Sequence, residues 1–433
     1  MKRQTRPTRS RAHLVRPLVG AAVALACAGA AQAQLRPYYV TASQSISYDS
    51  NVFRVSEDED SDLISTTSLT VGVDQPIGRQ RVYGSLGTRY TAYRDNSDLN
   101  GLGYSAGVGL DWEAGSKFSG NARAAISESQ ASFDQYGSLQ RTETGKNEER
   151  SKTVDLSVQY GRVGILSLEA LGNYTDIDYS SNDFASRERK SRMFGGGVRW
   201  RPGGPWSFGL TARRTHGEYP AFASSAGDTV SDDFDRTDLD LTALYVATGK
   251  SNLSLRLTQT REDHERDEDR DFDGLTGALS WRYRATGKVS MALTVTRETG
   301  SGASFFTGTV ITDPDLPTPP IPSLVYLTDS RRTDIVSLNT NWQATGRIDV
   351  TLGLRYARDR FDNRFVTDAG EDDSSSRGSS RSVRLGASYA ITRVWSAACG
   401  LGYEKRSTEA QTGVGEYGYD ARTGYCSVTL ALR

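Results

Sequence analysis

The chain has 433 residues, 24% of them charged and 36% hydrophobic, and its formal net charge is −1. This balance argues against a nucleic-acid partner, which normally requires a basic face. After residue 33 no run of about 18 apolar residues occurs, which excludes a transmembrane helix in that part of the chain.

The first 33 residues have the pattern of a signal peptide. Several basic residues precede the apolar run 18–26, and Ala31-Gln32-Ala33 fits the cleavage signal. A lipid anchor on Cys27 fits less well, because Ala24 stands where a lipobox has leucine. We therefore expect residues 1–33 to direct export and residues 34–433 to form one outer-membrane β-barrel domain.

Residues 34–433 contain about 18 runs in which apolar and polar side chains alternate, the pattern of strands with two different faces. The first ten runs are 38–48, 64–73, 81–93, 104–112, 118–127, 153–160, 166–174, 192–200, 206–214 and 237–245. The other eight centre on Leu255, Leu279, Leu293, Leu338, Leu352, Leu385, Cys399 and Val428.

A junction of sequence Ala-Thr-Gly-Lys/Arg recurs between these runs, at 247–250, 285–288 and 344–347. Each copy reads as a tight hairpin turn, and long polar inserts separate the copies. Short turns that alternate with long loops are typical of outer-membrane barrels. We therefore predict an all-β fold, a transmembrane antiparallel barrel of about 18 strands (16–20) with short periplasmic turns and long extracellular loops. A periplasmic or surface all-β protein is the alternative.

The tryptophans favour the membrane barrel, because all six fall near short turns and none lies in a long insert. Amphipathic rings at one end of every hairpin form an interfacial girdle, whereas a sandwich would place tryptophan in mid-strand. The predicted girdle comprises Trp112, Trp200, Trp206, Trp281, Trp342 and Trp395.

Two cysteines follow the leader, Cys399 and Cys426, in the last two runs. In a simple hairpin they would lie roughly opposite each other, so a cross-strand disulfide is feasible in an oxidising compartment. Two small apolar residues on the lipid face are an equally good interpretation.

Arginine is frequent on the side of the runs that should face the interior. The arginines assigned there are Arg89, Arg123, Arg199, Arg213, Arg256, Arg282, Arg355 and Arg384, and the acids are Asp111, Asp155, Glu169, Asp238 and Asp240. A basic wall would favour anionic solutes or polymers. Alternatively, the arginines and acids pair with each other and only keep the interior polar.

No catalytic, cofactor or metal site is predicted. His216 and His264 fall in segments that read as solvated external loops, away from a fixed catalytic wall. The acidic inserts at 57–60, around His264 and at 368–373 could bind divalent cations or bridge lipopolysaccharide, but they match no defined calcium loop and read as solvated loop surface. The proline-rich segment 313–322 reads as a stiff arm that either enters the barrel or stands outside it.

Near the amino terminus, the segments 47–54 (Ser-Tyr-Asp-Ser-Asn-Val-Phe-Arg), 61–67 and 74–81, followed by 103–107 and Asp111-Trp112, carry a family resemblance. They are similar to the opening of the EpsL-like barrel proteins of exopolysaccharide biosynthesis operons. The resemblance covers roughly the first quarter of the chain and implies a role in export or assembly of the polymer. It supplies no catalytic residues.

The sequence thus predicts a non-enzymatic barrel in the outer membrane of a Gram-negative bacterium, acting as a passive polar conduit for exopolysaccharide. The alternatives are a general or anion-selective porin for small solutes, and a non-conducting scaffold that works through its loops. The expected partners are outer-membrane lipid and lipopolysaccharide, together with exopolysaccharide and other export components.

Overall fold

The computed structural model describes residues 37–131, 133, 145–161, 165–223, 229–266, 271–299, 331–367, 370–410 and 418–432, which form 18 antiparallel strands. The first nine are β1 Tyr38–Asp49, β2 Asp62–Ile77, β3 Gln80–Tyr93, β4 Gly101–Ala114, β5 Phe118–Gln130, β6 Glu148–Tyr160, β7 Leu166–Tyr179, β8 Arg189–Trp200 and β9 Trp206–Ala223. The other nine are β10 Thr229–Thr248, β11 Ser251–His264, β12 Phe272–Arg284, β13 Val289–Thr299, β14 Arg331–Gln343, β15 Ile348–Thr367, β16 Gly370–Ala390, β17 Trp395–Ala410 and β18 Tyr419–Leu432.

Among the described residues, two short 3-10 helices have defined bounds, η2 Ser97–Leu99 before β4 and η4 Asn182–Arg187 before β8. In the described part of the chain, no helix has the length and apolar character needed to cross a membrane.

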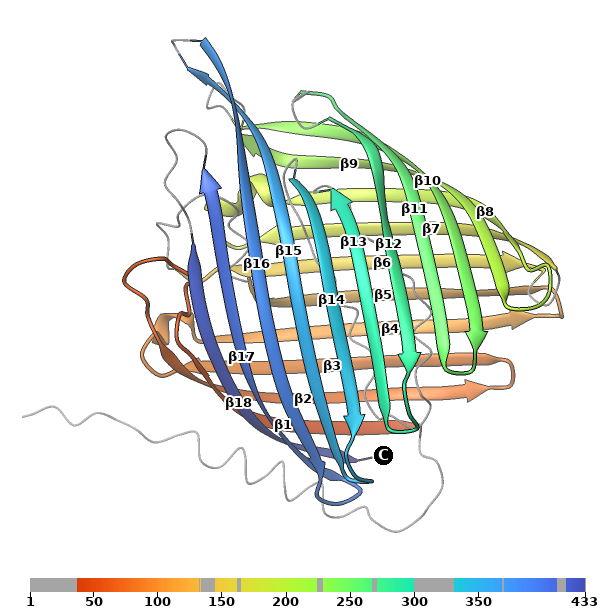
Figure 1. Ribbon diagram of the computed structural model, residues 1–433, viewed down its shortest axis with the longest axis horizontal. Coiled ribbons are helices and arrows are strands. Elements are labelled where there is room, and N and C mark those ends of the chain that lie inside the picture. The colour runs from red at the N-terminus through yellow and green to blue at the C-terminus, as the bar shows by residue number, and fades with distance from the viewer. Residues whose placement is uncertain are drawn as a thin grey trace, which may run out of the picture.

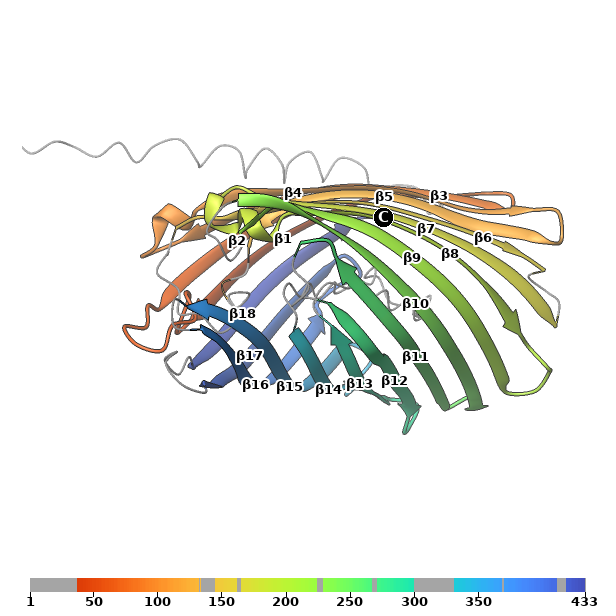
Figure 2. The ribbon, with the colours of Figure 1, turned by 90° about the horizontal axis from the view of Figure 1, so that it is seen from above.

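The sheet closes on itself. Each strand pairs with its neighbours in the chain, and β1 also pairs with β18 over ten positions, from Val40 opposite Leu432 to Asp49 opposite Thr423. Figure 1 shows β11–β17 crossing over the earlier strands, and Figure 2 shows β4–β8 on one wall and β12–β17 on the other. Closure leaves no unpaired edge, as the bilayer requires. The predicted 18-stranded transmembrane barrel is confirmed.

Four short turns, those after β10, β12, β14 and β16, share one device that explains the recurring junction. In the turn after β12, the Thr286 hydroxyl oxygen accepts hydrogen bonds from the backbone N–H groups of Lys288 at 3.1 Å and Val289 at 3.0 Å. Thr345 and Thr392 do the same after β14 and β16. The threonine therefore satisfies amides that the tight turn leaves without a strand partner.

At the opposite, extracellular end the strands extend further than predicted. The run expected at 237–245 is part of a strand that begins at Thr229, and β15 and β16 have 20 and 21 residues. Polar side chains such as Asp235 continue the ladder there, opposite His216. Backbone pairing between strands therefore continues beyond the segments in which apolar and polar residues alternate, and the sequence prediction was made from those segments.

A small apolar cluster closes the extracellular rim beside β1. It contains Val52, Phe53, Leu99 and Phe133, with Val55 and Tyr93 packed against it. The rings of Phe53 and Phe133 meet edge to face, with centroids 5.3 Å apart. The side-chain amide of Asn51 donates to the Val55 carbonyl at 2.7 Å and to the Asp420 carbonyl at 3.1 Å, which fixes the loop to β18.

Candidate functional site

Cross-strand register divides the side chains of each strand between two faces. On β10 the outward residues Leu239 and Leu241 are about half exposed, whereas the inward residues Asp238 and Asp240 are 2% and 4% exposed. The apolar face meets lipid and the polar face lines the interior. The same register places all eight arginines assigned to the interior on that face, together with the five acids named with them.

An interior polar network joins β9, β10 and β11, and consists of Arg213, Arg236, Asp238, Asp240, Thr258, Thr260 and Glu262. Arg213 contacts both oxygens of Asp240, with Nε to Oδ2 at 2.6 Å and Nη2 to Oδ1 at 3.0 Å. Arg236 Nε lies 3.1 Å from both oxygens of Asp238. The Arg213–Asp240 contact is bidentate, and a pair of this kind holds arginine and carboxylate in a defined geometry.

Threonine hydroxyls complete the network from β11. Thr258 donates to Asp240 at 2.6 Å, and Thr260 donates to Asp238 at 2.7 Å. Both threonines are buried. Since buried carboxylates are costly unless paired and hydrogen-bonded, these contacts compensate for the loss of water around the two acids.

His264 extends the buried cluster toward the extracellular end, which corrects the expectation that it lies in a solvated loop. It is the last residue of β11 and is 6% exposed. Its Nδ1 lies 2.8 Å from Asp232, and its Nε2 lies 3.0 Å from Glu262. His216 also belongs to a strand, β9, but it points outward and remains largely exposed.

A smaller interior pair lies on β7 and β8. Arg199 Nη2 is 3.0 Å from Glu169, and the Thr211 hydroxyl donates to the same carboxylate at 3.0 Å. On the wall near β3, Arg123 Nε donates to the Tyr83 hydroxyl at 2.6 Å. The Arg199–Glu169 ion pair matches the alternative view in which interior charges neutralise each other.

Three of the eight interior arginines differ from those of the network because they have no ion-pair partner among the described residues. Within the described ranges, no carboxylate lies within ion-pair distance of Arg89, Arg355 or Arg384. Arg89 and Arg384 are exposed on the interior face, and Arg355 is half-buried. Arg384 has Gly353 and Gly402 as its cross-strand neighbours, so neither flanking residue covers it with a side chain. β3 and the pair β15–β16 belong to opposite walls in Figure 2.

The six tryptophans lie on the outward face at the short-turn end of their strands. Trp206 stacks on Tyr245 with ring centroids 4.3 Å apart, and Trp281 stacks on Tyr283 at 5.4 Å. The Trp281 indole N–H donates to Ser251 at 3.0 Å. The rings thus combine apolar contact with a polar partner, as residues at a membrane interface do.

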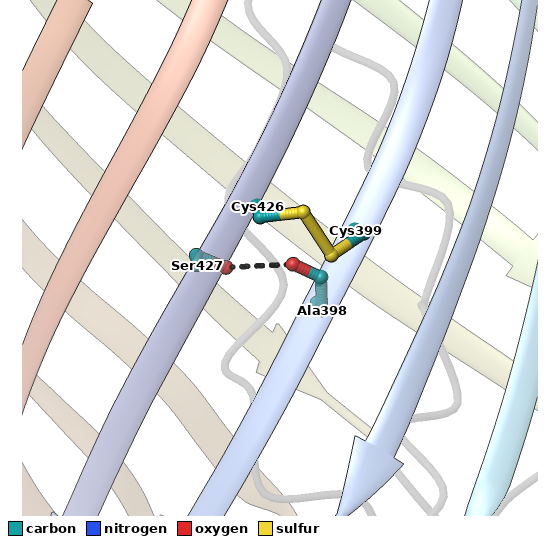
Figure 3. Close-up of a disulfide and its surroundings, with 4 residues drawn as sticks. All are labelled: Ala398, Cys399, Cys426 and Ser427. Atoms are coloured by element: carbon teal, nitrogen blue, oxygen red, sulfur yellow. Dashed lines mark hydrogen bonds between the residues drawn. A yellow bond between two sulfur atoms is a disulfide. The ribbon is translucent and has the colours of Figure 1, made fainter.

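Cys399 and Cys426 lie directly opposite each other on β17 and β18 and are bonded as a disulfide (Figure 3). Both are exposed and share the outward face with Leu401, which is 69% exposed. Beside the bond, the Ser427 hydroxyl donates to the Ala398 carbonyl at 3.5 Å (Figure 3). The disulfide therefore faces the lipid.

The sequence did not indicate which residues would complete the interior network. Thr258, Thr260 and Glu262 follow Arg256 at two-residue spacing and lie on the same face of β11. This spacing could have predicted that their side chains face the interior. Their partners come from β10, and sequence alone does not fix the alignment of β10 with β11.

The family of the chain is shown by comparison with family models. Residues 167–405, more than half of the chain, match the family model described as "TonB dependent receptor-like, beta-barrel". The chain belongs to this family. A TonB dependent receptor-like barrel resides in the outer membrane of Gram-negative bacteria, so the predicted location is confirmed. No curated protein matches the chain.

Solved structures similar to this TonB dependent receptor-like barrel include two outer-membrane proteins of Pseudomonas aeruginosa. OpdK is 13% identical, covers 91% of this chain and 99% of its own, and has a TM-score of 0.45. OpdO is 14% identical, covers 92% and 98%, and has a TM-score of 0.47. The siderophore receptor PirA from Acinetobacter baumannii is 8% identical, covers 93% and 81%, and has a TM-score of 0.45.

The resemblance to EpsL-like exopolysaccharide proteins is wrong, since the family match is to TonB dependent receptor-like barrels. The motif that carried the resemblance has a local structural explanation. Asp49 pairs with Arg54 at 2.9 Å, Asn51 ties the loop to β18, and Val52 and Phe53 are buried in the rim cluster. The motif therefore specifies a loop conformation.

Several predictions concern residues outside the described ranges. These are the signal peptide 1–33 and the proline-rich segment 313–322, which stay predictions. Of the acidic inserts, 57–60 is an exposed loop, and no side chain is described in 368–373.

Proposed function

We propose that this barrel is a porin-like passage for small solutes with a preference for anions. The observation that carries the proposal is the set of three interior arginines that have no carboxylate within ion-pair distance among the described residues. Asp238, Asp240 and Glu169 are held in pairs with arginine. Arg89 lies on one wall and Arg355 and Arg384 lie on the opposite wall, and the positive charge of all three faces the interior.

Charged residues that line a pore set its selectivity, because a solute of opposite sign is stabilised where it has shed part of its water. Barrels of 16–18 strands are wide enough for an aqueous channel. The arginines without a paired carboxylate on β3, β15 and β16 place positive charge on both walls of the interior face. A small anion is therefore favoured over a cation of equal size.

The family supports a second candidate, a receptor that takes up a specific ligand. The strand number favours the first candidate, since about 22 strands and a plugged interior are typical of outer-membrane transporters of the receptor type. A non-conducting scaffold that acts through its loops is the third candidate.

Conductance of the refolded full chain in a planar phospholipid bilayer separates these candidates. We expect an ohmic current whose reversal potential in a salt gradient shows anion preference. The triple variant R89Q/R355Q/R384Q should lose most of that preference while remaining a folded, heat-modifiable barrel. The matched control R214Q/R261Q/R297Q removes three arginines from the outward face and should leave the selectivity unchanged.

Equal selectivity of wild type and the triple variant would refute the anion preference. A folded barrel that carries no current favours the scaffold or the receptor. Those two then separate by whether any solute binds to the silent protein.

A further inference from the structure

The outward face has charged side chains above its apolar band, and several of its cations are paired with carboxylates. Arg297 lies 2.6 Å from Asp334, Arg261 lies 3.1 Å from Asp263, and Lys152 lies 3.0 Å from Asp176. Arg214 pairs with Asp235 in the same way at 3.5 Å. Single outward cations without such a carboxylate also occur among the described residues, namely Lys190 and Arg192 on β8 and Arg332 on β14.

The outward face of β15–β18 is different. It carries a basic patch that we define as Arg358, Arg381, Lys405 and Arg422. Register places Arg381 opposite Lys405, and Arg422 opposite Tyr403 just below Lys405. All four are exposed. None has a carboxylate within ion-pair distance in the part of the chain that the structure describes, although the outward Asp420 lies opposite Lys405 in the ladder.

The patch lies at a defined height in the membrane. From Trp395 in the periplasmic girdle to Lys405, β17 advances by about ten residues, which at about 3.3 Å each and a tilt of about 40° spans about 25 Å. This is the height of the apolar band of an outer-membrane barrel. The patch therefore begins where the hydrocarbon ends.

Two tyrosines mark the same boundary. Tyr356 and Tyr403 are the last outward residues before the patch, and both are about 40% exposed. The guanidinium of Arg381 lies over the Tyr356 ring, 5.8 Å from its centroid. The ring holds the cation at the interface, and the guanidinium keeps its N–H groups available for an anion.

We propose that the basic patch binds the phosphate groups of lipopolysaccharide in the outer leaflet. The headgroup of this glycolipid carries phosphates on a disaccharide at the level where the hydrocarbon ends. Arginine binds phosphate oxygens through paired N–H groups, and the acyl chains pack on the apolar residues directly below, including Val383 and Leu401. This site faces lipid on the outside of the wall, so it stands whether or not the interior conducts.

Binding of purified bis-phosphorylated lipid A to the full chain in detergent tests the proposal, with native mass spectrometry as the readout. Each neutralised cation should weaken binding about fivefold, which corresponds to about 1 kcal/mol. The quadruple variant R358Q/R381Q/K405Q/R422Q should therefore bind at least about 100-fold more weakly than wild type. The single variants R381Q and K405Q should each lose about fivefold, and they keep the test valid if the quadruple variant folds poorly.

The matched control K152Q/R214Q/R261Q/R297Q removes four outward cations at the same end and should bind lipid A like wild type. Dephosphorylated lipid A should bind wild type and the quadruple variant equally weakly. The proposal is overturned if the quadruple variant binds as tightly as wild type, or if the control loses as much. It is also overturned if phosphatidylglycerol displaces lipid A at equal concentration, because the patch would then recognise any anionic lipid.

Discussion

Replacing Arg213 with methionine should destabilise the folded barrel by about 3–5 kcal/mol, the usual cost of removing one partner from a buried ion pair. The Arg213 side chain is 11% exposed and that of Asp240 is 6% exposed. The substitution leaves Asp240 with the Thr258 hydrogen bond and the electrostatic interaction with Arg256, while Asp238 keeps Arg236. The cost arises because the buried Asp240 loses the counter-charge that is hydrogen-bonded to both of its oxygens.

The double variant R213M/D240N should recover most of the loss, because the amide keeps the hydrogen bond from Thr258 and carries no charge. The three variants and wild type form a double-mutant cycle, measured by urea unfolding of the barrel in lipid vesicles. We expect an interaction free energy of about 2 kcal/mol or more between the two positions. A loss below about 1 kcal/mol in R213M, or simple additivity in the double variant, would refute the view that this pair is buried and dry.

Three further predictions concern other parts of the molecule. The disulfide closes a sequence separation of 27, so C399S/C426S should lower the free energy of unfolding by about 3.5 kcal/mol, and a reducing agent should lower it equally in wild type but not in the variant. At the extracellular rim, burial raises the pKa of Asp62, but hydrogen bonds from the Asn96, Asp95 and Arg94 amides outweigh it and hold the pKa below the ordinary carboxyl value. The stabilisation by ionised Asp62 is therefore present above the ordinary carboxyl pKa and is lost as the pH falls through the lowered pKa. The variant D62N should be less stable than wild type at neutral pH, and its free energy of unfolding should fall less steeply at acidic pH. An equally steep fall in D62N would contradict this. In the rim cluster, F53A should cost about 3–5 kcal/mol locally, seen as faster proteolysis of the loops 50–61 and 94–100 with the heat-modifiable barrel intact.

The sequence predicted the periplasmic half of the fold well, because its signals are local. Thr-Gly-Lys/Arg turns and apolar alternation between neighbouring residues are sufficient to count the strands and assign their faces. The extracellular half was predicted less well, since polar residues such as those near Asp235 continue the strands without alternation. There the backbone ladder determines the structure and the side-chain pattern does not.

The interior network shows a second limit. His264 lies in a segment rich in charged residues, which reads as a loop when each charge is assumed to meet water. In the fold, Asp232 from β10 and Glu262 from β11 surround the imidazole. Such mutual compensation depends on the alignment of two strands and is invisible in either strand alone.

The position of the disulfide has a consequence for how the barrel assembles. It joins β17 to β18, and β18 is the strand that must find β1 to complete the barrel. A one-residue slip of β18 would turn Tyr425 and Ser427 toward lipid and bring the outward apolar residues inside. In a chain oxidised before insertion, the disulfide therefore fixes the register of β17 and β18 before the hairpin enters the membrane, and only the pairing of β1 with β18 remains to form. In a reduced chain, the correct β17–β18 register must compete with shifted registers while β1 and β18, the strands farthest apart in the sequence, also have to pair.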